Sequence, residues 1–203
     1  MKRHLFATAL LCTLLCAACT GDDYTPKPRT FVRLDLPDKA YTLCDTAVLP
    51  FRFERATDAQ MTVKRRNASE IWVDLTYPDY RGLVYLSYKP LRKPADLPNQ
   101  IDTSYRLLKM HFDQTSGVEE KQYIDAAARV FATTYRLKGS AVASTFQFWA
   151  TDSVQHFLRG SLFLDCPPRN DSLAPVLDYL QQDLIHLVET LRWRNNPSSP
   201  TRP

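Results

Sequence analysis

The densest group of side chains that could do chemistry lies within residues 151–160. Asp152, Ser153 and His156 fall within five positions, and Arg159 follows three residues later. Asp, Ser and His make up a hydrolase triad, but a triad is recognised by spatial roles rather than by crowding in sequence. These residues fall on a turn between two predicted strands, where Asp and Ser commonly hydrogen-bond the local backbone. The chain has no G-x-S-x-G motif. The segment is therefore interpreted as a structural turn, a partner-binding loop or part of a hydrolase site.

Other titratable residues form weaker patterns. His186 lies on a predicted helix, with Asp183 three residues before it and Glu189 three residues after it. Its helical angle falls off the apolar stripe, which predicts a solvated or edge histidine. Glu119 and Glu120 are adjacent on a predicted strand, so their side chains point to opposite faces and cannot act on one substrate.

The first nineteen residues resemble a lipoprotein export signal. A positively charged start precedes the apolar run Leu5–Leu15, and small residues then lead to Cys19. The run is too short to span a membrane, which takes about 20 apolar residues. The pattern predicts a signal peptide over residues 1–18 and a lipid-modified, palmitate-bearing Cys19 that anchors the chain to an envelope membrane. An ordinary signal peptide, cut after Ala18 without lipid attachment, is the alternative.

Two cysteines, Cys44 and Cys166, remain in the mature chain beside the lipidated one. In an oxidising envelope compartment they could form a disulfide, and two separate buried thiols are the alternative. Neither lies at metal-ligand spacing from another Cys or His, so no metal site is expected.

Composition excludes several classes of function. The chain has 26 basic and 22 acidic residues and a formal net charge of +4. No basic stripe stands out, which argues against nucleic-acid binding. Only five glycines are present, which argues against phosphate-cradling loops and a dinucleotide fingerprint. We therefore expect no cofactor.

The remaining sequence predicts one α+β domain. Residues 19–30 form a polar, proline-bearing tether after the signal peptide, residues 31–194 form a single globular domain, and residues 195–203 form a disordered tail. Alternation of apolar and polar residues, with short turns between segments, predicts antiparallel strands. The predicted strands are Phe51–Arg55, Met61–Lys64, Ile71–Tyr77, Leu83–Tyr88, Glu119–Ile124, Val130–Leu137, Ala141–Ala150 and Phe157–Leu164.

Two helices are expected to pack on this antiparallel sheet. The first is Leu97–Phe112, with one apolar stripe. The second is a long, C-terminal amphipathic helix whose apolar residues recur at three- and four-residue spacing from Leu173 to Leu191. Asp171 or Ser172 is the expected N-cap of that helix.

Several stretches match one family in order and spacing: Asp23–Arg29, Arg33–Pro37, Leu86–Lys89, Thr151–Ser153, His156–Gly160, Asp171–Val176 and Asp183–Thr190. Together they resemble the gliding motility lipoproteins called GldD, over nearly the whole mature chain. The resemblance implies an envelope lipoprotein of gliding motility and of the associated type IX secretion machinery. It implies no enzymatic reaction. The alternation of strands and flanking helices also resembles PsbP-like domains, which would fit an assembly factor.

The main functional hypothesis is a non-enzymatic assembly factor that docks on other envelope proteins of this apparatus. The residue after the lipid-bearing cysteine is Thr20 rather than Asp, which favours the outer membrane, facing the periplasm, and surface exposure stays open. The candidate docking residues are Asp152, Ser153, His156, Arg159, Asp171 and Ser172.

Two alternatives belong to other classes of function. The first is an envelope hydrolase in which Ser153, His156 and either Asp152 or His186 converge. The second is a lipoprotein that binds an apolar ligand in a pocket between the sheet and a helix.

Overall fold

The computed structural model describes residues 36–65 and 70–194. The predicted signal peptide, lipidated Cys19 and tether, and the predicted tail over residues 195–203, lie outside the described residues.

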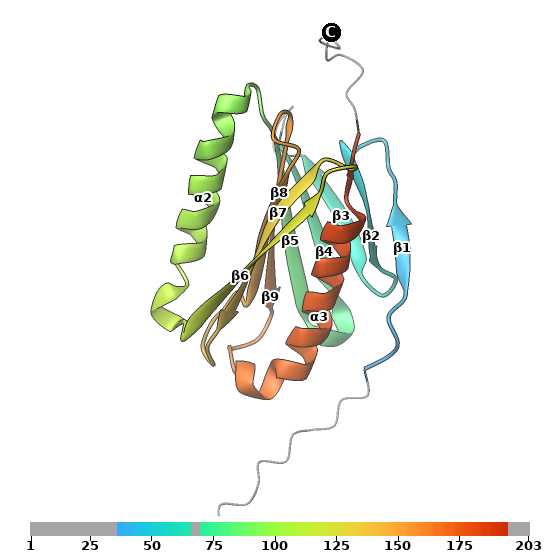
Figure 1. The fold of residues 1–203 in the computed structure, drawn as a ribbon. Coiled ribbons are helices and arrows are strands. Elements are labelled where there is room, and N and C mark those ends of the chain that lie inside the picture. The colour runs from blue at the N-terminus through green and yellow to red at the C-terminus, as the bar shows by residue number, and fades with distance from the viewer. Residues whose placement is uncertain (1–35, 66–69, 195–203) are drawn as a thin grey trace, which may run out of the picture. The chain divides into compact units, whose positions relative to one another are not determined.

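The main body of the described chain is a seven-stranded antiparallel sheet (Figure 1). Its spatial order is β3-β4-β5-β9-β8-β7-β6, so β3 and β6 are its edges. The strands are β3 (Gln60–Arg65), β4 (Ile71–Tyr77), β5 (Gly82–Pro90), β6 (Gly117–Asp125), β7 (Val130–Lys138), β8 (Phe146–Thr151) and β9 (His156–Leu164).

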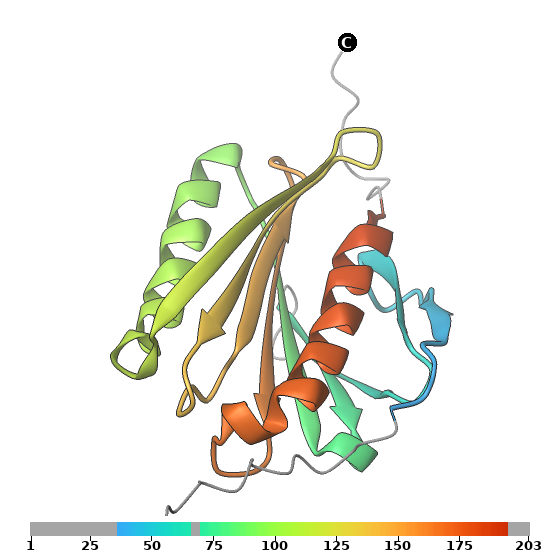
Figure 2. The same cartoon turned by 60° about the horizontal axis from the view of Figure 1, so that its bottom comes forward.

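A smaller sheet and two helices complete the described fold. The smaller sheet has the order β1-β2-β10, with β1 (Tyr41–Cys44), β2 (Phe51–Ala56) and the short β10 (Arg192–Trp193). The helices are α2 (Leu97–Lys109) and α3 (Asn170–Thr190), and they lie on opposite sides of the large sheet (Figures 1 and 2). The α+β class, the antiparallel pairing and the long C-terminal helix are as the sequence predicts.

Alternation along the strands decides which side chains enter the core. On β4, Ile71, Val73, Leu75 and Tyr77 are buried against α3 and the small sheet, whereas Trp72 points to the other face and is exposed. A strand places successive side chains on opposite faces, so this pattern gives the large sheet an inner face toward α3 and an outer face toward α2.

Helix α3 packs its apolar side against the inner face. Its buried residues recur at helical spacing and include Val176, Leu180, Leu184 and Leu187. The helix approaches the sheet closely, because a Cβ atom placed on Gly82 would lie 2.8 Å from Leu180 Cδ1. Within residues 36–65 and 70–194, no helix is both long and apolar enough to cross a membrane.

Helix α2 covers only part of the outer face. Leu108 of this helix packs against Tyr135 and Leu137 of β7, and against Val142 in the following loop. Phe112 and Trp149 extend this small cluster. The outward side chains of β3, β4 and β5 therefore lie beyond the reach of the cluster under α2.

Two predicted boundaries are wrong. The segment 141–145, predicted as the start of a strand, forms a loop, since β8 begins only at Phe146. The Asn170 side chain holds this loop by donating to the carbonyl oxygens of Gly139 and Val142. The first helix ends at Lys109 rather than Phe112, which instead begins a separate 3-10 turn.

Gly160 is required by the packing between β8 and β9. A Cβ atom at this position would lie closer than 3.0 Å to three ring atoms of Phe148, which is 1% exposed. The ring fills the space that any larger residue at position 160 would occupy.

We predict that Gly160→Ala destabilises the fold by about 1–3 kcal/mol, because overpacking displaces a buried ring. Thermal unfolding measures the effect. Gly117→Ala is the matched control, since nothing lies within 4 Å of a Cβ placed there, and its stability should change by less than about 0.5 kcal/mol. Equal losses in the two variants would contradict this account of Gly160.

Candidate functional site

The polar segment after β8 forms a closed turn. Asp152 Oδ1 accepts hydrogen bonds from the backbone N–H groups of Val154, Gln155 and His156 at 2.8–2.9 Å. Ser153 has a positive φ of 67°, and its N–H donates to Thr151 Oγ1 at 2.9 Å. Asp152 is 8% exposed, and its Oδ1 atom accepts these three backbone N–H groups rather than a histidine ring N–H. The structural-turn interpretation accounts for this carboxylate, as expected for an Asp that caps a local turn.

His156 is a buried packing residue at the start of β9. It is 4% exposed, its Nδ1 lies 2.9 Å from the Tyr88 hydroxyl, and its ring stacks on Trp193 with centroids 5.0 Å apart. Burial lowers the pKa of the imidazole, while the Asp152 charge and a hydrogen bond with the Arg194 backbone act in the opposite direction. Ser153 and His156 are neighbours in this turn, where Ser153 donates its backbone N–H to Thr151 and the His156 imidazole lies against the Tyr88 hydroxyl.

Arg159 lies on the opposite face of the sheet from His156. The two positions differ by three along β9, so their side chains alternate to different sides. Arg159 Nη2 donates to Gln147 Oε1 at 2.8 Å, and burial lowers the pKa of the guanidinium. His156 belongs to the inner face beside Trp193, whereas Arg159 belongs to the outer face.

Asp171 and Ser172 lie at the far end of the sheet. Both are exposed in the first turn of α3, and the N-cap position is Arg169, so the expected cap at Asp171 or Ser172 is wrong. The helix begins earlier because Asn170 is held by the loop after β7. Since β9 runs nine residues at about 3.3 Å each, roughly 30 Å separates this helix start from the turn at Asp152. The six candidate docking residues therefore lie in three separate places.

The two cysteines of the described chain are free, so the Cys44–Cys166 disulfide is wrong. Cys44 ends β1, whose neighbour β2 contacts Thr190 at the C-terminal end of α3. Cys166 lies beside Asn170, at the N-terminal end of the same helix. A helix of 21 residues spans about 30 Å, whereas a disulfide needs Cα atoms within about 7 Å.

A buried ion pair that the sequence did not reveal fixes the start of the described chain to α3. Lys39 Nζ lies 2.6 Å from Asp183 Oδ1, and Asp183 is 2% exposed. The Tyr41 hydroxyl donates to the same oxygen at 3.2 Å, and Lys39 also lies over the ring of Tyr179. Burial raises the pKa of Asp183 and lowers that of Lys39, and the attraction between the two opposes both shifts. Burial and the Asp183 charge raise the pKa of Tyr41 to about 12.

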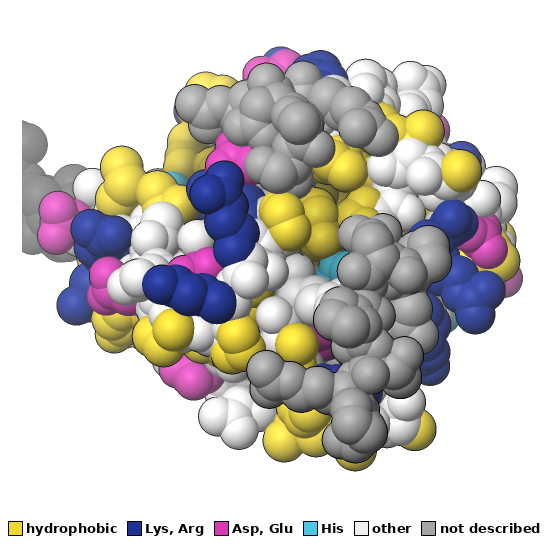
Figure 3. Space-filling view, turned by 90° about the horizontal axis from the view of Figure 1, so that it is seen from above, with side chains coloured by type: hydrophobic (Ala, Val, Ile, Leu, Met, Phe, Trp, Pro, Cys, Tyr) yellow, Lys and Arg dark blue, Asp and Glu magenta, His cyan; other side chains and the backbone are white. Residues whose placement is uncertain are grey.

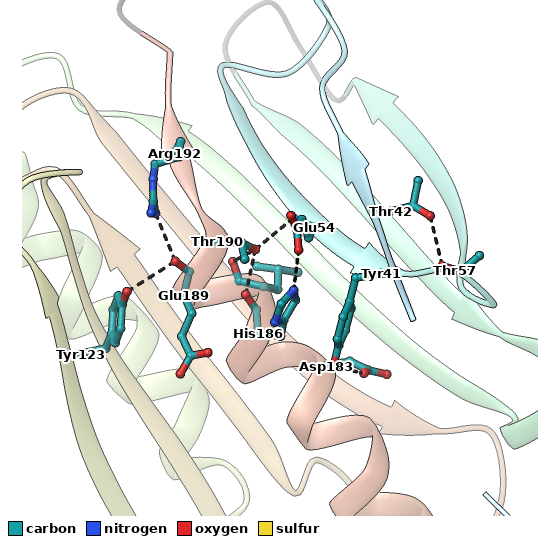
Figure 4. A network of polar contacts seen from close by, with 11 residues as sticks. Tyr41, Thr42, Glu54, Thr57, Tyr123, Asp183, His186, Glu189, Thr190 and Arg192 are labelled. Carbon is teal, nitrogen blue, oxygen red and sulfur yellow. Dashed lines mark hydrogen bonds and ion pairs between the residues drawn. The ribbon is translucent and has the colours of Figure 1, made fainter. Parts of the chain in front are cut away.

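His186 extends this network toward the small sheet (Figure 4). Its Nε2 lies 2.7 Å from Glu54 Oε2, and its ring stacks on Tyr41 at 3.6 Å. The Thr190 hydroxyl links the two elements, since it accepts from the Glu54 N–H and donates to the His186 carbonyl. His186 is thus a half-buried edge histidine that joins α3 to β2. Ser153 lies in the turn between β8 and β9 and takes no part in this network.

A hollow of about 400 Å³ opens beside the Asp152 turn, at the end of the molecule that Figure 3 views. We call it the end hollow. Val154 of the turn is 38% exposed at its rim. The end hollow is lined by Arg52, Arg129, Asp152, Val154, Gln155, Arg192 and Trp193, with Ala127 and Ala128.

Arginines give the end hollow its polar character. Arg52 pairs with Asp45 at 3.6 Å, and Arg192 pairs with Asp125 at 3.5 Å. Arg129 donates to the Asp152 carbonyl oxygen. Hydrophobic side chains lie beside Lys and Arg side chains on this end of the surface (Figure 3).

Metal and apolar-ligand sites have little support among the described residues. No group of three His, Cys, Asp or Glu side chains within residues 36–65 and 70–194 could hold a metal ion. An apolar cavity between β9, the loop after β7 and the start of α3 measures about 100 Å³, against about 300–1,000 Å³ for most ligand sites.

Comparison with known families matches residues 21–193 to the profile described as gliding motility lipoprotein GldD. The chain belongs to the GldD family. Its match ends at Trp193, the residue that stacks on His156 beside the Asp152 turn. No curated protein was found to match the chain in sequence. Membership supports a lipoprotein of the cell envelope with a role in gliding motility.

Because burial lowers the pKa of His156, the stability of this GldD-family fold should depend on pH. The unfolded chain takes up a proton near the ordinary histidine pKa of about 6.5, whereas folded His156 resists protonation. Stability is therefore fully present above that pH and is lost as the pH falls below it. We expect His156→Gln to reduce the loss of stability between pH 7.5 and 5.5, measured by chemical denaturation.

Tyr88→Phe is the control for that measurement. It removes the hydroxyl beside Nδ1 but keeps the titrating imidazole, so the variant should be less stable at both pH values and should still lose stability as the pH falls. An unaltered pH dependence in His156→Gln would show that other groups, such as His111, carry the effect.

Proposed function

We propose that the chain is an envelope-anchored, non-enzymatic accessory factor of gliding motility and of the associated type IX secretion machinery. The observation that carries the proposal is the GldD family match over residues 21–193. The export signal over residues 1–18 and a palmitate-bearing Cys19 supply the anchor, with the outer membrane, facing the periplasm, as the proposed location. The resemblance to PsbP-like domains stays a prediction and agrees with an assembly role.

The non-enzymatic part of the proposal is supported by the use of the polar side chains. The Asp152 carboxylate accepts three backbone N–H groups, and His156 is buried against Tyr88 and Trp193. A hydrolase would need a serine hydroxyl and a histidine placed together for proton transfer. In this turn the Asp152 carboxylate holds the backbone, and the His156 imidazole lies against the Tyr88 hydroxyl.

We place the docking surface for partner envelope proteins at the end hollow. Its rim combines the exposed Val154 with Trp193 and several arginines, and interfaces favour such aromatic and arginine residues. Of the predicted docking residues, Asp152 lines this hollow, Ser153 shapes its turn and His156 supports Trp193 from beneath. Asp171 and Ser172 form a second, separate exposed place at the start of α3.

Deletion of the gene in the native host should abolish spreading and reduce the secreted proteome. Complementation with the wild-type chain should restore both, whereas Cys19→Ser should not, because a single unlipidated chain lacks the membrane anchor. Colony spreading and mass spectrometry of the medium measure the two outcomes. Normal movement and normal secretion after deletion would reject the proposed function.

Val154→Glu tests the location of the docking surface. The side chain is 38% exposed, so the charge should leave the thermal midpoint unchanged while reducing complementation and co-purification of envelope partners. Val118→Glu on the edge strand β6 is the matched control, since Val118 is 41% exposed and lies at the opposite end of β6 from Asp125, which pairs with Arg192 of the end hollow. Full activity of Val154→Glu together with loss in Asp171→Lys would move the surface to the start of α3.

A further inference from the structure

The outer face of the large sheet carries a second hollow, away from the end hollow and from α2. It measures about 420 Å³ and lies over β3, β4, β5 and β9. Trp72 and Tyr85 are 38% and 45% exposed there. We call it the outer hollow, and its side chains are Lys64, Trp72, Asp74, Tyr85, Ser87 and Arg159.

Strand register explains why this surface is hollow. Trp72 pairs with Ser87 across β4 and β5, and Ser87 pairs with Arg159 across β5 and β9. The small serine therefore lies between two large side chains in one row of the sheet. In the next row Asp74 pairs with Tyr85, which places a second aromatic ring diagonally from Trp72. The outer hollow is therefore lowest at Ser87 and is bordered by the aromatic rings of Trp72 and Tyr85 and by the Arg159 side chain.

Of the two cations in the outer hollow, Lys64 has a carboxylate partner and Arg159 has only a neutral one. Lys64 has a carboxylate partner, since its Nζ lies 2.6 Å from Asp74 Oδ2. None of the ion pairs formed by the described residues includes Arg159, whose hydrogen bond goes to the neutral amide of Gln147. Burial lowers the pKa of its guanidinium, and no carboxylate of the described residues forms an ion pair with it to offset that desolvation cost. A planar guanidinium in this state suits a carboxylate or phosphate that arrives with a ligand.

Two buried polar side chains beside Arg159 also have an atom without a hydrogen-bond partner among the described residues. Gln147 Nε2 and Ser161 Oγ lack a hydrogen-bond partner among the described residues, and both side chains are 2% exposed. Gln147 and Ser161 pair with each other across β8 and β9, next to the row that holds Arg159. Gln147 and Ser161 thus lie buried beside Arg159, and neither of them lines the outer hollow.

We propose that the outer hollow binds a sugar ring that carries a carboxylate. The exposed rings of Trp72 and Tyr85 give flat apolar surfaces for the C–H face of the ring, and Arg159 pairs with the carboxylate. Asp74 and Ser87 offer hydrogen bonds to hydroxyl groups. The volume of the outer hollow lies within the range of small-ligand sites. The site is separate from the end hollow and does not rest on the proposed role in motility.

A matched pair of sugars tests this proposal. N-acetylmuramic acid differs from N-acetylglucosamine by a lactyl group that bears the carboxylate. The full chain, purified in a detergent without a sugar head group, is titrated with each and followed by saturation-transfer NMR. We expect millimolar binding of N-acetylmuramic acid, at least about tenfold tighter than N-acetylglucosamine, because single contacts of this kind give weak affinities. Glucuronic acid against glucose distinguishes an acidic polysaccharide from a cell-wall glycan as the source.

Variants separate the two halves of the site. Arg159→Gln should remove the preference for the acidic sugar, and Trp72→Ala should weaken both sugars. Arg106→Gln and Tyr105→Ala on α2 are the controls, since Arg106 is an exposed cation and Tyr105 is 40% exposed. Because Trp72 is exposed, its variant keeps the test valid even if Arg159→Gln unfolds.

Three results would overturn the proposal. They are no saturable binding up to the solubility of the sugars, binding that lactate alone reproduces, and binding that survives both Arg159→Gln and Trp72→Ala. Tighter binding of an aspartate-rich peptide than of any sugar would also reject it, and would make the outer hollow a protein contact.

Discussion

The fold depends on how two helices cover a wide sheet. Seven strands spaced about 4.8 Å apart make a surface roughly 30 Å wide, whereas a helix with its side chains is about 10–12 Å across. One helix cannot cover either face. On the inner face, α3 is joined by β2, whose Phe51 and Phe53 complete the core. On the outer face, α2 has no such companion among the described residues, and the surface of β3, β4 and β5 stays open.

Lys39 and Arg159, both desolvated by burial, have opposite kinds of partner. Lys39 meets a buried carboxylate, Asp183, and the pair connects the start of the described chain to α3. Arg159 meets only an amide. Because a charge taken out of water needs a countercharge to offset the cost, the first arrangement is complete within the described chain and the second is open to a ligand. This contrast separates a structural contact from a candidate binding contact.

The local pattern of apolar residues predicts which helices and strands form better than it predicts the residues at which they begin and end. The alternation over residues 71–77 and the helical spacing from Leu173 onward gave the right elements, because each is set by one buried face. The loop over residues 141–145 was missed, since it depends on hydrogen bonds from Asn170, almost thirty residues away. Because of the same Asn170 contact, the helix begins at Asn170, earlier than predicted, and Asp171 and Ser172 lie in its first turn rather than at the N-cap.

The candidate site could be predicted only in part. Asp152 as a turn residue followed from its type and place, and the separation of His156 from Arg159 follows from the two-residue period of a strand. The partner of Asp183 lies 144 residues earlier, so no local pattern could supply it. Asp183 lies three residues after Leu180, on the apolar side of the helix, and a carboxylate buried there needs a partner. That position was the signal in the sequence that a partner exists.

The position of the Lys39–Asp183 pair also bears on mechanical force. A pull transmitted from the amino-terminal side would enter the described fold at residues 36–40, before it reaches the hydrogen bonds between β1 and β2. Lys39 is the first residue there with a buried partner, and that partner belongs to the central helix rather than to an edge strand. Tension would therefore be passed to α3, whose apolar face packs into the core, and the short strand β1 would be shielded from peeling.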